Sequence, residues 1–214
     1  MKLLLTSGGI SNRSIAKAFA ELVGKNPSDV TIGYIPIAAN VEGGNKDWVL
    51  KDFFNLWRYG YNQIDIIDPT AAGVDWKGRL ADVDVVQLSS GNTFHLLNQT
   101  RKTGLDKWLQ ENLKTKVYVG GSASSILVTP TIAIAGAGAY HDENIPKLKD
   151  LTGLNFVDFE TSPHSPSWVS YEEVQDYTKT SPHKLYALDD MSAIKVDGDK
   201  MEVISEGAWK LFNG

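Results

Sequence analysis

The chain reads Val117-Tyr118-Val119-Gly120-Gly121-Ser122-Ala123-Ser124-Ser125-Ile126-Leu127 near its middle. β-Prone apolar residues run into two glycines and a serine, and small residues then open a helix. This order is typical of a nucleophile elbow, a tight turn that lifts a serine hydroxyl above the edge of a sheet. The helix N-terminus behind Ser122 would offer free N–H groups and positive potential to an oxyanion. A plain βα turn with an N-cap serine has the same pattern, so residues elsewhere must distinguish the two.

Strand and helix patterns alternate on the N-terminal side of this stretch and through it. Short apolar runs predict strands at Lys2–Thr6, Val30–Ile37, Gln63–Ile67, Val85–Leu88 and Lys116–Val119. Helical spacing predicts one helix after a cap at Ser11 or Asn12 and another from about Thr93. A third predicted helix, Trp48–Tyr59, has Val49, Phe53, Leu56 and Trp57 on one face. Alternation with short turns predicts an α/β fold, a mostly parallel central sheet with helices on both faces.

The C-terminal part has a looser pattern. Asn155–Phe159 and Lys184–Leu188 are predicted to be further strands. Ala193–Val196 and Met201–Ile204 flank Asp197-Gly198-Asp199, which predicts a C-terminal β-hairpin. Neither repeats nor low-complexity linkers divide the sequence, so residues 1–214 are expected to form a single α/β hydrolytic domain.

Composition excludes several classes of function. The 214 residues carry a formal net charge of −5, which disfavours nucleic acid as a partner. The sequence contains no cysteine, which excludes disulfides, a Cys nucleophile and Cys-ligated zinc and fits a cytoplasmic protein. The apolar run at the start, Leu3-Leu4-Leu5, is too short for a signal peptide, and no run approaches the ~18 residues of a membrane span.

A serine nucleophile needs a base within hydrogen-bond reach. Of four histidines, His164 lies in Ser162-Pro163-His164-Ser165-Pro166, where two prolines would hold the side chain in place. His183 lies in a similar Ser-Pro-His segment and is its main rival, whereas His95 and His141 fall in a helix and a polar loop. A carboxylate should orient the imidazole, and Asp142 or Glu143, between the serine and the histidine, is expected to do so.

A second strand-to-helix turn lies at Leu88-Ser89-Ser90-Gly91-Asn92-Thr93-Phe94. Its backbone N–H groups could supply the other half of an oxyanion hole. The candidate residues for oxyanion and substrate binding are therefore Gly91 and Asn92 in this turn with Gly121 and Ala123 in the elbow.

Taken together, these segments resemble the peptidase E family of serine dipeptidases, which are aspartyl dipeptidase-like. The resemblance spans nearly the whole chain. It rests on Tyr34-Ile35-Pro36-Ile37-Ala38-Ala39, Ser90-Gly91-Asn92-Thr93-Phe94-His95-Leu96-Leu97, Gly120-Gly121-Ser122-Ala123 and Leu154-Asn155-Phe156 before Pro163-His164, which occur in the family's order. The resemblance implies a class I glutamine amidotransferase-like fold, shared with cyanophycinase, and serine peptidase activity.

The resemblance also implies residue roles. Ser122 matches the nucleophile, His164 the general base, and Gly91 and Ala123 the positions whose N–H groups hold the oxyanion. Asp142 matches the acidic member by its distance ahead of the histidine, with Glu143 as the alternate. The expected mechanism is acyl transfer to water, without metal or cofactor.

Two departures from the family bear on function. Ser124 stands where the family usually has glycine, and the segment after Pro163-His164 lacks the arginine that could bind an aspartyl side chain. A short peptide is the expected substrate, without a strict preference for an N-terminal aspartate. A catalytically inactive binding module on the same fold is the alternative. A homodimer is left open, since tryptophans such as Trp168 or Trp209 could mark an interface if exposed.

Overall fold

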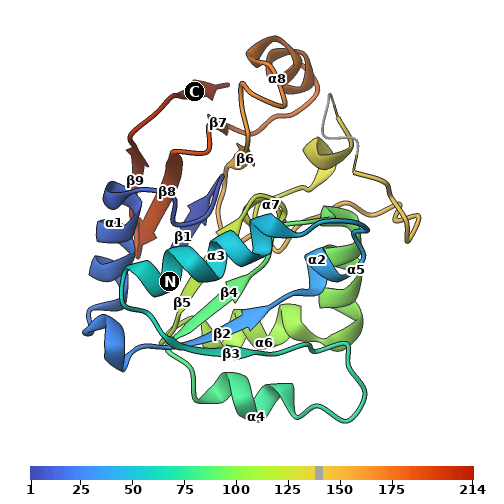
Figure 1. Cartoon of the computed structure of the whole chain (residues 1–214). Helices are drawn as coiled ribbons and strands as arrows, with labels where there is room; N and C mark the ends of the chain where they lie inside the picture. The colour runs from blue at the N-terminus through green and yellow to red at the C-terminus, as the bar shows by residue number, and fades with distance from the viewer. Residues whose placement is uncertain (138–141) are drawn as a thin grey trace.

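The structure, a computed structural model, describes residues 1–137 and 142–214. Its main sheet has seven strands in the order β3-β2-β4-β5-β1-β8-β9 (Figure 1). The strands are β1 (Lys2–Thr6), β2 (Thr31–Ile35), β3 (Gln63–Ile66), β4 (Val85–Leu88), β5 (Val117–Gly121), β8 (Ser192–Asp197) and β9 (Lys200–Ser205). Strands β1 to β5 are parallel, and β8 and β9 add an antiparallel hairpin beside β1. The predicted mostly parallel α/β fold and the C-terminal hairpin are confirmed.

Helices cover both faces of this sheet (Figure 1). They are α1 (Arg13–Val23), α2 (Ile37–Asn40), α3 (Asp47–Arg58), α4 (Trp76–Ala81), α5 (Thr93–Thr103), α6 (Leu105–Asn112), α7 (Ala123–Leu127) and α8 (Tyr171–Thr178), with 3₁₀ turns at Pro27–Asp29 and Ala133–Gly136. Residues of α1 and α3 pack into one buried cluster, and those of α4 to α7 pack into the other, so the sheet is buried on both sides. Among the described residues, none of these helices has the length and apolar character needed to cross a membrane.

A second sheet of three strands was only partly expected. It has the order β10-β7-β6, with β6 at Glu160–Ser162, β7 at Leu185–Leu188 and β10 at Trp209–Phe212. The prediction of a strand at Asn155–Phe159 is wrong. Asn155 has a left-handed backbone (φ 56°), and this segment packs Val157 and Phe159 into the core from an irregular path. Burial, rather than strand pairing, therefore explains its apolar residues.

The two sheets bring four strand ends together. Strands β1 and β5 are parallel neighbours, so Ser7 and Ser122, the residues after each, lie at one edge of the main sheet. Strands β6 and β7 are also parallel, so His164 and Asp190, each two residues past its strand, leave the same edge of the second sheet. The candidate site lies where these edges meet.

Candidate active site

Ser122 sits in a strained turn between β5 and α7. Its backbone has φ 50° and ψ −114°, a conformation that is rare for any residue with a Cβ and that persists only where the surroundings enforce it. The Ser122 N–H donates to the carbonyl of Thr6 on β1 at 3.0 Å, which fixes the turn to the sheet. Gly120 is required before it, because a Cβ there would lie 2.6 Å from the Ser124 carbonyl oxygen. This is the geometry expected of a nucleophile elbow.

Ser124, which replaces the family's usual glycine, holds the elbow together from behind. Its buried hydroxyl accepts from the Gly121 N–H at 2.8 Å and donates to the Leu88 carbonyl of β4 at 2.8 Å. The side chain thus points into the space between β4 and β5 and leaves the Ser122 hydroxyl unobstructed. The departure from the family pattern is compatible with an open elbow.

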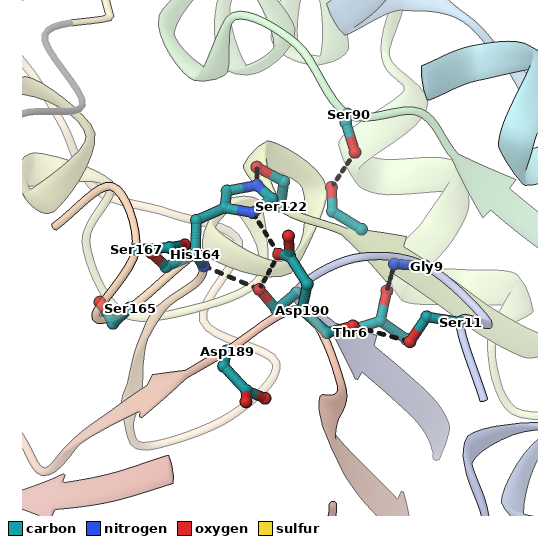
Figure 2. Close-up of polar contacts among 12 residues, drawn as sticks. Thr6, Gly9, Ser11, Ser90, Ser122, His164, Ser165, Ser167, Asp189 and Asp190 are labelled. Atoms are coloured by element: carbon teal, nitrogen blue, oxygen red, sulfur yellow. Dashed lines mark hydrogen bonds and ion pairs between the residues drawn. The ribbon is translucent and has the colours of Figure 1, made fainter. Parts of the chain in front are cut away.

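His164 is held in position by its own backbone and by a ring neighbour. It has a left-handed backbone (φ 56°), and its N–H donates to the Ser7 hydroxyl at 2.7 Å. The Trp168 ring lies 4.4 Å from the imidazole, inclined by 31°. The imidazole Nε2 lies 2.9 Å from the Ser122 hydroxyl oxygen, so the two side chains that the sequence analysis paired are within hydrogen-bond distance (Figure 2).

Asp190 is the carboxylate that contacts the imidazole. Its Oδ1 lies 2.5 Å from His164 Nδ1 and accepts a further hydrogen bond from the Ser7 hydroxyl at 3.2 Å (Figure 2). The hydrogen bond with His164 is the main reason that the pKa of the Asp190 carboxyl is held below its usual value, and the hydrogen bond from the Ser7 hydroxyl adds to it. The carboxylate stays ionised, which favours the tautomer with Nδ1–H donating to Asp190 and Nε2 free to accept from Ser122.

The expectation that Asp142 or Glu143 orients the imidazole is wrong. Asp142 Oδ2 accepts from the Thr93 N–H at 2.8 Å, at the start of α5, and the Glu143 carbonyl accepts from the Asn92 side chain at 3.0 Å. Both residues therefore fasten the loop after α7 to the Gly91 turn, away from Nδ1 of His164. Burial raises the pKa of the Asp142 carboxyl.

Asp190 was not expected from the sequence, because it follows both the serine and the histidine in the chain, whereas the expected carboxylates lie between them. One signal was present: Asp189-Asp190 directly follows the predicted strand Lys184–Leu188. The neighbour Asp189 is used differently, since its carboxylate accepts from Met191 N–H, Ala208 N–H and the Ser192 hydroxyl. Only the folded chain distinguishes the two aspartates.

Gly8 makes room for Asp190. A Cβ on Gly8 would lie 2.8 Å from the Asp190 carbonyl oxygen, so only glycine allows the β1–α1 turn to approach this closely. This turn packs against the site aspartate, which explains the glycine at position 8.

Two backbone N–H groups lie beside Ser122 without a protein acceptor. The N–H groups of Gly91 and Ala123 donate to no described residue, so both are free to bind an oxyanion. Gly91 cannot be replaced, because it has φ 128° and a Cβ would lie 2.2 Å from the Ala38 carbonyl oxygen. The other two candidates are engaged: the Gly121 N–H binds Ser124, and the Asn92 carboxamide caps α5 through the His95 N–H.

The serine and the imidazole open into a cavity of about 420 Å³. Its walls come from both glycine turns, the elbow, and α3, whose contribution is Trp48, Lys51 and Asp52. Neither His95 nor His183 lines it. His183 lies just before β7, at the strand end opposite Asp190, where its carbonyl accepts from the Asn213 carboxamide. His141 lies outside the described residues. His164 is thus the histidine of the described chain that serves this cavity.

Asp52 is a half-buried acid on the cavity wall. It accepts from the Tyr34 hydroxyl at 3.3 Å, and burial raises its pKa to about 7. The unfolded chain releases this proton near pH 4, whereas the folded chain keeps it until near pH 7. The folded state therefore binds more protons in that window, and the Asp52 contribution makes the protein less stable as pH rises through it.

Asp52→Asn is expected to remove this dependence. The free energy of unfolding would be measured by urea denaturation from pH 5 to pH 9. Relative to the natural protein, the variant should become more stable as pH rises from 5 to 7, and the difference should stay constant above pH 7. Glu111→Gln, an exposed change on α6, is the control and should run parallel to the natural protein. Parallel curves for Asp52→Asn as well would contradict the assignment.

A strained serine, an imidazole and a carboxylate in line at the edge of a parallel sheet are typical of serine hydrolases. The model of peptidase family S51 matches residues 3–204. An uncharacterised peptidase of Pasteurella multocida is 31% identical over 206 residues, covering 92% of this chain and 94% of the relative. Peptidase E of Shewanella sp. is 24% identical over 152 residues, covering 65% of this chain and 61% of the relative. The chain belongs to peptidase family S51, the peptidase E family.

Solved structures agree with this placement. The crystal structure of a Listeria monocytogenes protein, assigned provisionally to peptidase E, superposes with a TM-score of 0.81 at 26% identity and covers 96% of this chain and 98% of that one. A peptidase from an acI-B1 actinobacterium shares the fold, with a TM-score of 0.73 at 16% identity over 97% of this chain and 88% of that one. The protein is a peptidase by family.

Proposed function

We propose that this chain is a serine peptidase that hydrolyses short peptides, dipeptides among them, through an acyl-enzyme. Ser122 is the nucleophile, His164 the general base, and Asp190 the carboxylate that orients the imidazole. The observation that carries the proposal is the line of contacts from Asp190 Oδ1 to His164 Nδ1, at 2.5 Å, and from Nε2 to the Ser122 hydroxyl, at 2.9 Å.

The reaction follows from these positions. His164 takes the proton of Ser122 as its oxygen attacks the peptide carbonyl, and the oxyanion is held by the N–H groups of Gly91 and Ala123. His164 then protonates the leaving amine, and water, activated by the same imidazole, releases the acyl group. Asp190 stabilises the imidazolium that exists between these steps. Loss of one oxyanion donor typically lowers the rate by about 10²–10³, so the Gly91 turn matters nearly as much as the three side chains.

The size and charge of the cavity favour a small substrate that carries a positive charge at one end. A volume of about 420 Å³ suits a short peptide. Three carboxylates besides Asp190 line it, those of Glu42, Asp52 and Asp142, against one cation, Lys51, and the described lining includes no arginine. Burial raises the pKa of each of the three, and a bound ammonium group would offset that effect. The free amine of a peptide is thus favoured there, and an aspartyl side chain is not.

A dipeptide panel tests this proposal. Ala-Ala and Lys-Ala are expected to be hydrolysed with kcat/KM at least about tenfold above that of Asp-Ala, and N-acetylation of Ala-Ala should lower its kcat/KM by a similar factor or more. Preferred hydrolysis of Asp-Ala would contradict the specificity. No turnover of any peptide, together with no labelling by a fluorophosphonate, would favour the inactive binding module.

A further inference from the structure

Helix α3 exposes an apolar stripe on its outer side. Leu50, Phe54 and Trp57 follow one another at the i, i+4 and i+7 positions, and they are 65%, 57% and 66% exposed. The opposite side of the helix is already used, since Leu56 and Asn55 are buried against the sheet. A surface helix normally turns polar residues outward. The helical spacing predicts Trp57 on the same face as the inner residue Leu56, but the structure places it on this outer stripe.

A further exposed apolar residue lies on the edge strand of the sheet. Ile66 on the edge strand β3 is 56% exposed. It pairs in register with Tyr34, whose ring contacts Phe53 of α3 at 4.5 Å, so Ile66 points to the same side of the sheet as α3.

Charges of opposite sign lie at the two ends of the stripe. Asp47 and Arg58 are exposed, and neither forms an ion pair with another described residue. At roughly 100° per residue, both fall with Leu50, Phe54 and Trp57 within about 100° of the helix circumference. Asp47 precedes the stripe in the sequence and Arg58 follows it. An antiparallel second copy of this face would therefore place each charge near the opposite charge.

We propose that this face of α3 is the centre of a two-fold interface with a second copy of the chain. Two antiparallel α3 helices would put Phe54 beside the partner's Phe54 at the axis and Leu50 against the partner's Trp57. Asp47 of each copy would then meet the partner's Arg58, which gives two ion pairs from one contact. An isologous interface requires this self-complementarity. A parallel arrangement would instead set like charges together, and an anionic membrane surface would select cations rather than one charge of each sign.

The cysteine-free sequence allows a direct test of the axis. Helices that pack at 8–10 Å bring residues at the contact to Cα separations of roughly 3.4–5.4 Å, after two helix radii of roughly 2.3 Å are subtracted. The upper part of that range lies within the roughly 4.4–6.8 Å that a disulfide spans. Phe54→Cys under mild oxidation should therefore give a covalent dimer on non-reducing gels. Leu211→Cys, at another exposed apolar position, is the matched control and should stay monomeric on the gel.

Charge reversal tests the orientation. By sedimentation velocity at micromolar concentration, the natural chain should be dimeric. Asp47→Arg or Arg58→Asp alone should raise the dimer dissociation constant by about tenfold or more, because each puts two like-charge pairs into the interface. The double variant, Asp47→Arg with Arg58→Asp, should restore the dimer. A monomeric natural chain, a failure of the double variant to recover, or equal crosslinking of the two cysteine variants would overturn the proposal. All these readouts are masses, so they do not depend on peptidase activity or on the proposed function.

Discussion

Replacing Ser122 with alanine is expected to lower kcat/KM for short peptides by about 10⁴–10⁶ and to abolish labelling by a fluorophosphonate. In the proposed mechanism the whole acyl-transfer route passes through this hydroxyl. In serine hydrolases, removal of the nucleophile alone typically lowers kcat about as much as removal of the whole triad. A residual rate from the oxyanion donors and substrate binding should survive. Because alanine lacks only the hydroxyl, the fold should survive as well.

Ser28→Ala is the matched control for this change. Ser28 is exposed on the 3₁₀ turn at Pro27–Asp29 and is not among the residues lining the cavity, so labelling and hydrolysis should be unchanged. Circular dichroism would verify the fold of both variants. Undiminished labelling of Ser122→Ala would show that another residue carries the reaction.

Asp190→Asn is expected to lower kcat by about 10²–10⁴. An asparagine retains the size of the side chain, but it can no longer stabilise the imidazolium, and it can hold the His164 ring in the wrong tautomer. The loss should appear in kcat more than in KM, because the interaction strengthens when the imidazole becomes charged.

Asp142→Asn is the comparison that separates the two carboxylates. The carboxamide oxygen can still accept from the Thr93 N–H, so the start of α5 stays capped and kcat should change by about tenfold or less. A large loss in Asp142→Asn with little change in Asp190→Asn would restore the assignment made from the sequence alone.

Much of the fold could be predicted from local patterns. Lys2–Thr6 and Val85–Leu88 form strands with the predicted bounds, and Asn12 caps α1 by accepting from the Ile15 N–H. Buried parallel strands have continuous apolar runs that chemistry alone marks out. Asn155–Phe159 resembles such a run for a different reason, since Val157 and Phe159 are buried without strand pairing.

The site could be predicted only in part, for a physical reason. The elbow is local: glycines, a serine and small residues must stand in sequence order for the turn to form. The partner carboxylate is not local, because its place depends on two sheets meeting at their edges, and no local pattern in the sequence reveals that meeting. Asp190 therefore stayed hidden beside Asp189, and Asp142 appeared suitable by its position between the serine and the histidine.

The most direct test of the central claim is the position of the covalent adduct. The natural protein would be treated with a fluorophosphonate, digested, and mapped by tandem mass spectrometry. A single adduct on Ser122, with peptide hydrolysis abolished in the modified protein, is the result expected from an imidazole 2.9 Å from that hydroxyl. An adduct on a different residue, or full hydrolysis by protein that carries the adduct on Ser122, would contradict it.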